Sequence, residues 1–230
     1  MKEILTNSIY FGFFLTIGAY LAGLWVKQKL KLAIFNPLLI AVLLVMACLM
    51  ATGVEYEAYQ EGGEFVSGLL TPATVCLAIP LYKQLRMLRK HLAAVAVGIT
   101  SGVITSAVCV FLLCSLFHLG HEHYVTMLPK SITTAIGMGV SEEAGGIVTL
   151  TVLSILVTGI TGNMCAQLLC KLAGITHPVA KGLAIGTSSH ALGTAEALEM
   201  GEIEGAMSSL SIAVAGLMTV VVVPLVSGWI

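Results

Sequence analysis

Long apolar runs alternate with short polar connections along this chain, and the pattern predicts helices that cross a membrane. A spanning helix needs about 20 mostly apolar residues. Four runs are clearly long enough: 8–26, 92–117, 147–170 and 207–230. Two shorter runs, 37–54 and 66–82, are flanked by Pro37 and Pro80. We expect all six runs to form helices embedded in the membrane.

Two further runs, 128–146 and 179–198, are apolar but rich in Gly, Ser, Thr and ionisable residues. Irregular backbone at membrane depth is tolerated only against protein or a water-filled cavity, so these runs are typical of interrupted or re-entrant segments. The sequence therefore predicts an all-α integral membrane protein with about six to eight transmembrane helices, including such segments. We expect a single transmembrane domain over residues 1–230.

Prolines and glycines mark the places where these helices should break. The segments that follow Pro72 and Pro129 share a short pattern, which leaves both an internal repeat and a chance similarity open. Paired segments interrupted by Gly or Pro are typical of binding sites in transporters built from repeats. The predicted structural breaks are Pro72, Pro80, Pro129, Gly137, Gly145, Gly146, Gly186 and Gly193.

Composition supports the membrane interpretation and excludes several classes of protein. The chain is 57% hydrophobic and only 10% charged, whereas a soluble domain carries about 25% charged residues. We therefore expect a lipid bilayer around it. The net charge of -1 argues against a nucleic-acid partner. The six cysteines form no metal-binding or disulfide pattern, and we expect neither a metal nor a cofactor.

The distribution of Lys and Arg predicts the orientation in the membrane. Most of them lie in two connections, 27–36 and 83–91, which we expect on the cytoplasmic side. The connection 55–65 holds four Glu and no base, which favours the outside. The N-terminus is then external, and the run 8–26 is too long for a signal peptide, so it predicts a retained first helix.

The first candidate site lies at the start of the segment 128–146. Pro129 is suited to opening a helix, and Ser131, Thr133 and Thr134 place hydroxyls on its first turn. A helix start attracts anions, and Lys130 adds a full positive charge beside it. This combination favours binding of a carboxylate. The alternative is that Lys130 extends to the membrane interface and the hydroxyls only cap the helix.

Glu142 and Glu143 follow in the same segment. A charged residue at the bilayer centre costs about 2.5 kcal/mol or more on insertion scales, so buried glutamates need protein, water or a cation beside them. One hypothesis is a coupling site at which a glutamate binds H⁺ or Na⁺. The other is that 137–146 lies at the membrane surface and both carboxylates are solvated.

The second candidate site holds Thr187, Ser188, Ser189 and His190. On a continuous helix Gly182, Gly186, His190 and Gly193 would share one face, and small residues there would let another backbone approach. Ser189 and His190 are not expected to act as a catalytic pair, because adjacent helical residues point about 100° apart and no Asp orients the His. We predict no enzymatic activity.

Both candidate sites carry groups that lipid does not accept, so we expect 128–146 and 182–196 to meet near the membrane midplane and share one cavity. His190 would contact the solute or a coupling proton, since modest changes around a His change its charge. A third group, His118, His121 and His123, has only weak metal-site character. We predict that these three histidines lie in a solvated external loop without a metal.

Several motifs give the chain a resemblance to a known family. They include Lys130-Ser-Ile-Thr-Thr, Ser141-Glu with Gly145-Gly146, and the run from Gly182 to Ala195. Further matches are Asn36-Pro-Leu-Leu, Leu69-Leu-Thr-Pro-Ala, Pro80-Leu-Tyr and Gly201-Glu-Ile-Glu-Gly. With them the sequence resembles the LrgB/CidB family over nearly its whole length. Two positions depart from the family pattern: Glu143 stands where Gln is common, and Glu196 where Arg or Lys is common.

The resemblance implies a multi-pass protein of the bacterial cytoplasmic (inner) membrane. Bacterial members are described as antiholin-like regulators of murein hydrolases, often beside a small holin-like partner of the LrgA/CidA type. The plastid relative moves glycolate and glycerate, and some bacterial relatives are linked to pyruvate uptake. We expect a homodimer that transports small monocarboxylates, with H⁺ or Na⁺ as a possible coupling ion. The alternative is a holin-like or antiholin-like regulator of cell lysis.

Overall fold

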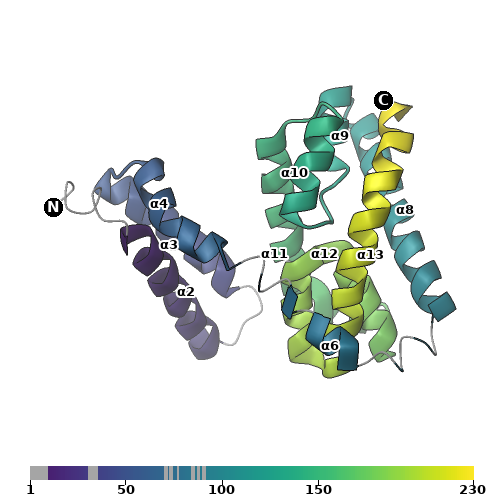
Figure 1. The fold of residues 1–230 in the computed structure, drawn as a ribbon, viewed down its shortest axis with the longest axis horizontal. Coiled ribbons are helices and arrows are strands. Elements are labelled where there is room, and N and C mark those ends of the chain that lie inside the picture. The colour runs from purple at the N-terminus through teal and green to yellow at the C-terminus, as the bar shows by residue number, and fades with distance from the viewer. Residues whose placement is uncertain are drawn as a thin grey trace. The chain divides into compact units, whose positions relative to one another are not determined.

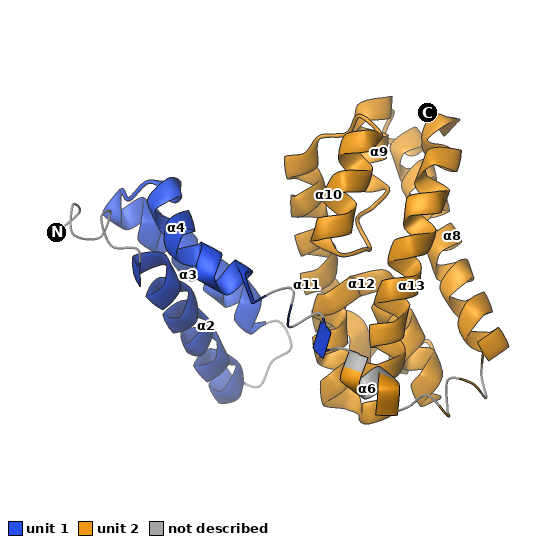
Figure 2. Cartoon of the chain, viewed as in Figure 1, with its two compact units in different colours: residues 1–76 blue, residues 77–230 orange. Residues whose placement is uncertain are grey.

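The structure is a computed structural model that describes residues 10–30, 36–69, 72, 75–76, 78–83, 86, 89 and 92–230. These residues form helices and turns, with no strand among them. The chain divides into two compact units, Met1–Cys76 and Leu77–Ile230, drawn in two colours in Figure 2.

The first unit contains the helices α2 (Tyr10–Leu30), α3 (Pro37–Thr52) and α4 (Tyr56–Ser67). α3 begins where Asn36 Oδ1 accepts hydrogen bonds from the backbone N–H of Leu38 at 2.8 Å and of Leu39 at 3.3 Å. This is the usual capping geometry, with Pro37 in the first turn. α3 ends at Gly53, whose φ of 63° suits a residue without Cβ.

The second unit contains the longer part of the chain, and Figure 1 labels its helices. They are α6 (Ala78–Lys83), α8 (Leu92–Leu116), α9 (His121–Met127), α10 (Thr134–Glu143), α11 (Val148–Leu172), α12 (Pro178–Met200) and α13 (Glu202–Val226), followed by a 3₁₀ turn at Ser227–Trp229. α12 packs against α8, α11 and α13. α12 holds the second candidate site, so those three helices surround it.

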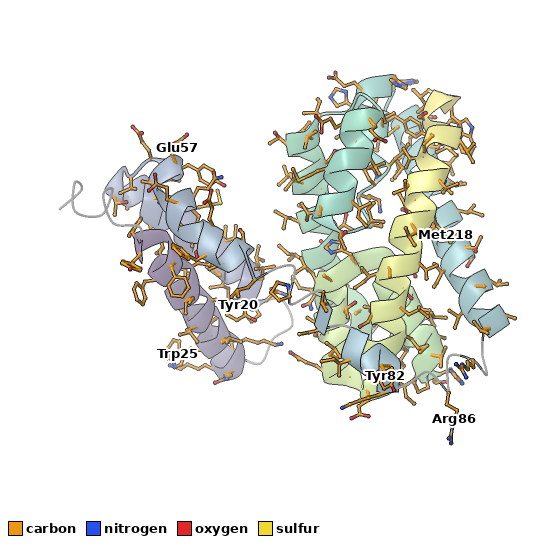
Figure 3. The ribbon with its side chains drawn as sticks, viewed as in Figure 1. Tyr20, Trp25, Glu57, Tyr82, Arg86 and Met218 are labelled. Atoms are coloured by element: carbon orange, nitrogen blue, oxygen red, sulfur yellow. The ribbon has the colours of Figure 1, made fainter. Side chains whose placement is uncertain are left out.

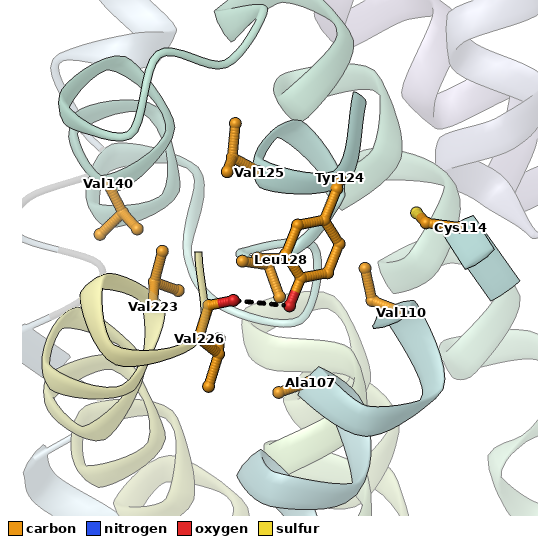
Figure 4. Packing of buried hydrophobic residues seen from close by; sticks show 9 residues of the cluster. All are labelled: Ala107, Val110, Cys114, Tyr124, Val125, Leu128, Val140, Val223 and Val226. Carbon is orange, nitrogen blue, oxygen red and sulfur yellow. Dashed lines mark hydrogen bonds between the residues drawn. The ribbon is translucent and has the colours of Figure 1, made fainter. Parts of the chain in front are cut away.

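A buried apolar cluster joins α8, α9, α10 and α13 at one end of this unit, as Figure 4 shows. Tyr124 is fully buried there, and its hydroxyl donates a hydrogen bond to the carbonyl of Val226 at 3.0 Å. A buried phenol needs such a partner.

Many large apolar side chains stay exposed on the outer faces of the helices. Tyr20 and Trp25, labelled on α2 in Figure 3, are 44% and 61% exposed.

The predicted all-α membrane fold is confirmed. Four described helices are long and apolar enough to span a bilayer: Tyr10–Leu30, Leu92–Leu116, Val148–Leu172 and Glu202–Trp229. The shorter run 37–54 is also helical, as α3. The count of six to eight spans, the single domain and the orientation stay predictions. Much of the connections 27–36 and 83–91 lies outside the described residues.

Some local predictions were wrong. α13 begins at Glu202 rather than at 207. The connection 55–65 is mostly helix α4, and its external side stays a prediction. Pro80 lies inside α6 instead of breaking a helix. The residues on both sides of Pro72 lie outside the described set, so its predicted break stays a prediction. Short apolar runs do not identify helix ends, because amphipathic segments such as α4 also form helices.

Candidate functional site

The most unusual backbone in the second unit is at His190, in the middle of α12. Its φ of 42° and ψ of -140° interrupt the helix, while the residues on both sides stay helical. Positive φ in a residue other than Gly costs about 1–3 kcal/mol and persists only where surrounding structure imposes it. The break predicted for α12 therefore exists, but it lies at His190. The predicted break positions Gly186 and Gly193 are both helical.

Contacts with α11 hold His190 in this conformation. His190 is 4% exposed, and its Nε2 lies 3.0 Å from the carbonyl oxygen of Ile155. A carbonyl only accepts, so Nε2 carries the proton in this pair. The imidazole packs on Gly159, where an added Cβ would lie 2.6 Å from His190 Cε1. Only a glycine at 159 leaves room for the ring.

Other polar side chains satisfy the backbone around the break. Thr194 Oγ1 donates to the carbonyl of His190 at 3.0 Å and lies 2.6 Å from Ser208 Oγ on α13. Asn163 Nδ2 donates to the carbonyl of Leu192 at 2.8 Å. Backbone groups freed inside a membrane protein need partners of this kind. Asn163 and Ser208 were missed by the sequence reasoning, since neither lies in the two candidate segments.

The predicted shared face of α12 is divided between two neighbours. Gly182 and Gly186 face α13, where a Cβ on Gly182 would lie 2.7 Å from Met207 Cβ and one on Gly186 would lie 2.8 Å from Ser208 Cα. His190 instead faces α11. The interruption rotates the chain, so spacing that assumes a continuous helix gives the wrong face for His190.

The serines beside His190 bond locally. Ser188 Oγ lies 3.3 Å from the carbonyl of Ile185 and 3.0 Å from Ser189 Oγ. Ser189 is buried against Gly162 of α11, where a Cβ would approach Ser189 Cβ to 2.5 Å. The hydroxyl of Thr187 donates to the carbonyl of Leu183. These hydroxyls are engaged within α12.

The first candidate segment has a turn where a helix start was predicted. Pro129 lies in the turn between α9 and α10, so it does not open α10. α10 begins at Thr134, and its N-cap residue Thr133 makes no side-chain capping bond. Gly137 lies within α10 and is not a break. An Ile155 side chain occupies the space beside it, which explains a glycine there.

Lys130 is connected to α8 through two hydroxyls. Its Nζ donates to Ser131 Oγ at 3.1 Å, and Ser131 Oγ lies 3.3 Å from Ser106 Oγ. In the part of the chain that the structure describes, Lys130 has no carboxylate partner. A half-buried cation without an acid partner suits an anionic ligand.

A small internal cavity brings the two candidate segments together. Ser131 and Thr187 both line it, with Ser106 of α8 and Thr219 of α13. Its volume is about 20 Å³, room for about one water molecule. The segments therefore meet at Ser131 and Thr187, but His190 is not among the residues that line this cavity. In this conformation the cavity is too small for a carboxylate.

Glu142 and Glu143 are both exposed at the end of α10. Neither forms an ion pair with Lys130 or a hydrogen bond to His190 among the described residues. This geometry fits the solvated alternative, and a coupling role stays a prediction. The chain then turns through Gly145, whose φ is 79°, and Gly146. At Gly146 a Cβ would lie 2.5 Å from Ser141 Oγ.

A buried hydroxyl cluster fixes this turn. Thr151 Oγ1 lies 2.6 Å from Ser141 Oγ and 3.0 Å from the carbonyl of Thr126, and all three residues are fully buried. Thr126 Oγ1 also accepts a bond from the N–H of Ile147 at 2.8 Å, which satisfies the first turn of α11. Thr126 and Thr151 were not singled out in the sequence. Neither threonine is adjacent in sequence to Gly145 and Gly146, so no local signal identifies them.

The histidines at 118–123 lie partly in helix α9 rather than in a loop. α9 begins at His121, whose Nδ1 lies 2.8 Å from the carbonyl of Ile230 at the C-terminus. His118 has a φ of 52° in the preceding turn. This pairing gives His121 a structural contact.

Comparison with known proteins identifies relatives along almost the whole chain. The model of the LrgB-like family matches residues 16–229. An antiholin-like protein LrgB of Bacillus subtilis is 39% identical over 220 residues, 95% of either chain. A holin-like protein CidB of Staphylococcus epidermidis is 36% identical over 210 residues, 91% of this chain and 92% of the relative. No solved structure matches the chain significantly.

Proposed function

This chain belongs to the LrgB-like family, and we propose that it acts as an antiholin-like or holin-like membrane protein. Such a protein either contributes to lesions in the membrane or restrains a partner that forms them. The observation that carries this proposal is the likeness to relatives with these names over 91–95% of the chain. It reverses the order of the two hypotheses from the sequence, because none of these relatives is named for transport of a carboxylate.

We further propose that the protein works in the bacterial cytoplasmic membrane, as a homodimer, with a small holin-like partner. The holin-like and antiholin-like names of its relatives support such a partner. The test uses purified protein in vesicles loaded with a fluorescent dye. Release of dye by this chain alone supports a holin-like role. If a small holin-like protein releases the dye and this chain suppresses that release, the result supports an antiholin-like role. No effect in either arm contradicts the proposal.

A second candidate is transport of a small organic anion of the monocarboxylate class. The observation that favours it is the interruption of α12 at a buried residue whose neighbours are polar. A lesion needs only simple amphipathic spans, whereas transporters place broken helices and polar groups at their binding sites. In this proposal Lys130 attracts the carboxylate and the cavity at Ser131 and Thr187 enlarges when the helices move.

Uptake of labelled pyruvate, glycolate or lactate into dye-loaded vesicles separates the two candidates. Transport predicts uptake without dye release. Lys130→Ala should then weaken uptake at least about tenfold through loss of a charge-assisted contact of 1.5–3 kcal/mol. Lys29→Ala is the matched control, since Lys29 is exposed and its ammonium lies 4.8 Å from the Trp25 ring centre. Equal uptake by both variants would exclude Lys130 from substrate binding.

A further inference from the structure

A second and larger hollow lies at the end of the second unit where α11 ends and α12 begins. Its volume is about 510 Å³, within the range of about 300–1,000 Å³ that small-molecule sites occupy. Residues from the end of α11, the connection to α12, the two ends of α12 and the start of α13 line it: Gln167, Cys170, Lys171, Gly174, Ile175, Thr176, Lys181, Met200 and Glu204. We call this hollow the α11–α12 groove.

The charges of the groove are unbalanced. Two lysines, Lys171 and Lys181, and one glutamate, Glu204, line it, so its formal charge is +1. Within the described residues neither lysine forms an ion pair with a carboxylate. Lys181 is partly buried. Because Lys171 and Lys181 outnumber Glu204, the lining keeps an excess of one positive charge, and a concave surface with such an excess attracts anions.

The wall of the groove is well defined by backbone hydrogen bonds. Gly174 has a φ of 66°, and its N–H donates to the carbonyl of Lys171 at 3.2 Å. The N–H of Ile175 donates to the carbonyl of Cys170 at 2.8 Å. This closes α11 with a glycine in the left-handed region and fixes the chain that carries Thr176. Lys171 and Thr176 therefore project from a fixed turn.

An excess of lysines on the cytoplasmic side of a membrane protein needs no binding site to explain it. The arrangement here differs from that of Lys29 in the first unit. Lys29 lies on the outer face of α2 above the Trp25 ring, whereas Lys171 and Lys181 come from two helices and line one hollow together with the hydroxyl of Thr176. The amide of Gln167 also lines it and donates to Glu196 Oε1 at 2.6 Å. Orientation alone places lysines at a surface but does not gather them around a concavity.

We propose that the α11–α12 groove binds an anionic phosphate or carboxylate group, with Lys171 and Lys181 as its charged contacts. The group comes either from a free anion or from the headgroup of an anionic lipid, which present the same chemistry to two ammonium groups. This site lies apart from His190 and Lys130, and it goes beyond either candidate function.

The experiment measures how fast a thiol in the groove reacts with a charged reagent. Each native cysteine is replaced by Ala, and Thr176→Cys provides an exposed thiol in the groove. Glu122→Cys provides an exposed thiol on α9 for comparison. The full chain is placed in phosphatidylcholine vesicles that are made permeable, so that the reagent reaches both faces of the membrane. A negatively charged thiosulfonate and a positively charged one are applied, with and without inorganic phosphate.

The groove thiol should react about tenfold faster with the anionic than with the cationic reagent, an effect of local positive potential. Inorganic phosphate should slow the anionic reagent at 176 and not at 122. Adding Lys171→Gln and Lys181→Gln should remove both effects, while Lys29→Gln should leave them. If phosphate gives no protection but phosphatidylglycerol in the vesicles slows the reaction in a Lys181-dependent way, the anion is a lipid headgroup.

The proposal is overturned if the two reagents react at similar rates at 176, or if both lysine substitutions leave the rates unchanged. Both substitutions are at side chains that bond to nothing else in the described residues, so folding should persist. Elution as a single species in detergent and an unchanged unfolding temperature confirm that the variants are folded.

Discussion

The two segments that interrupt the second unit lose their helical backbone in different ways. Between α10 and α11 the chain turns at Gly145 and Gly146, next to exposed Glu142 and Glu143. Within α12 it breaks at His190, which is 4% exposed and bonded to α11. The first break uses residues that adopt the conformation freely. The second is imposed on a residue that resists it, so α12 depends on tertiary contacts for its shape.

The first prediction is the largest and concerns close approach along α12. Gly186→Val should lower the free energy of unfolding by about 3 kcal/mol, because overpacking against backbone forces helices apart. A Cβ at 186 would lie 2.8 Å from Ser208 Cα of α13. Thermal unfolding in detergent measures the loss.

Gly139→Ala is its matched control in the first segment. Gly139 lies in α10, and a Cβ there meets nothing within 4 Å. Ala in a helix is favoured over Gly by about 0.5–1 kcal/mol, so this variant should be slightly more stable. If both variants behaved alike, the contrast between a packed and an open segment would be wrong.

The second prediction tests the strain at His190. His190→Val should lower the free energy of unfolding by about 2 kcal/mol or more, since it loses the bond to Ile155 and a β-branched residue resists positive φ. His190→Gly loses the same bond but relieves the backbone strain at this position, which amounts to about 1–3 kcal/mol. The Gly variant should therefore be the more stable of the two. Equal unfolding temperatures would show that the backbone at 190 is not strained.

The sequence predicted well what apolar length alone determines. α8 covers Leu92–Leu116 against the expected 92–117, because an uninterrupted apolar run leaves few alternatives. The break in α12 was expected at glycines and lies at His190, whose conformation depends on Ile155, 35 positions away. Such a pairing has no local signal. The two candidate segments were expected to share a site, and they meet at Ser131 and Thr187. The small volume of the cavity there depends on how four elements pack.

The third prediction addresses the turn between α10 and α11. Thr151→Val should cost about 1–3 kcal/mol, because Ser141 loses a buried partner and the Thr126 carbonyl loses a donor. Thr149→Val is the control, since Thr149 lies on the same helix but is exposed, and it should change stability by less than about 0.5 kcal/mol. Unfolding in detergent distinguishes the two. A loss of similar size in both would assign the effect to helix propensity instead of the buried cluster.

The last and smallest effect is expected at Glu142 and Glu143. Both carboxylates are exposed at the end of α10, so neutralising them should change the free energy of unfolding by less than about 0.5 kcal/mol. Glu142→Gln and Glu143→Gln, alone and together, keep the shape of the side chains and remove only the charge. A buried coupling site would behave differently, because removing a desolvated charge changes stability and ion binding together. The measurement is unfolding temperature with and without Na⁺ at two pH values. A Na⁺-dependent or pH-dependent shift in the native chain that disappears in the double variant would restore the coupling hypothesis.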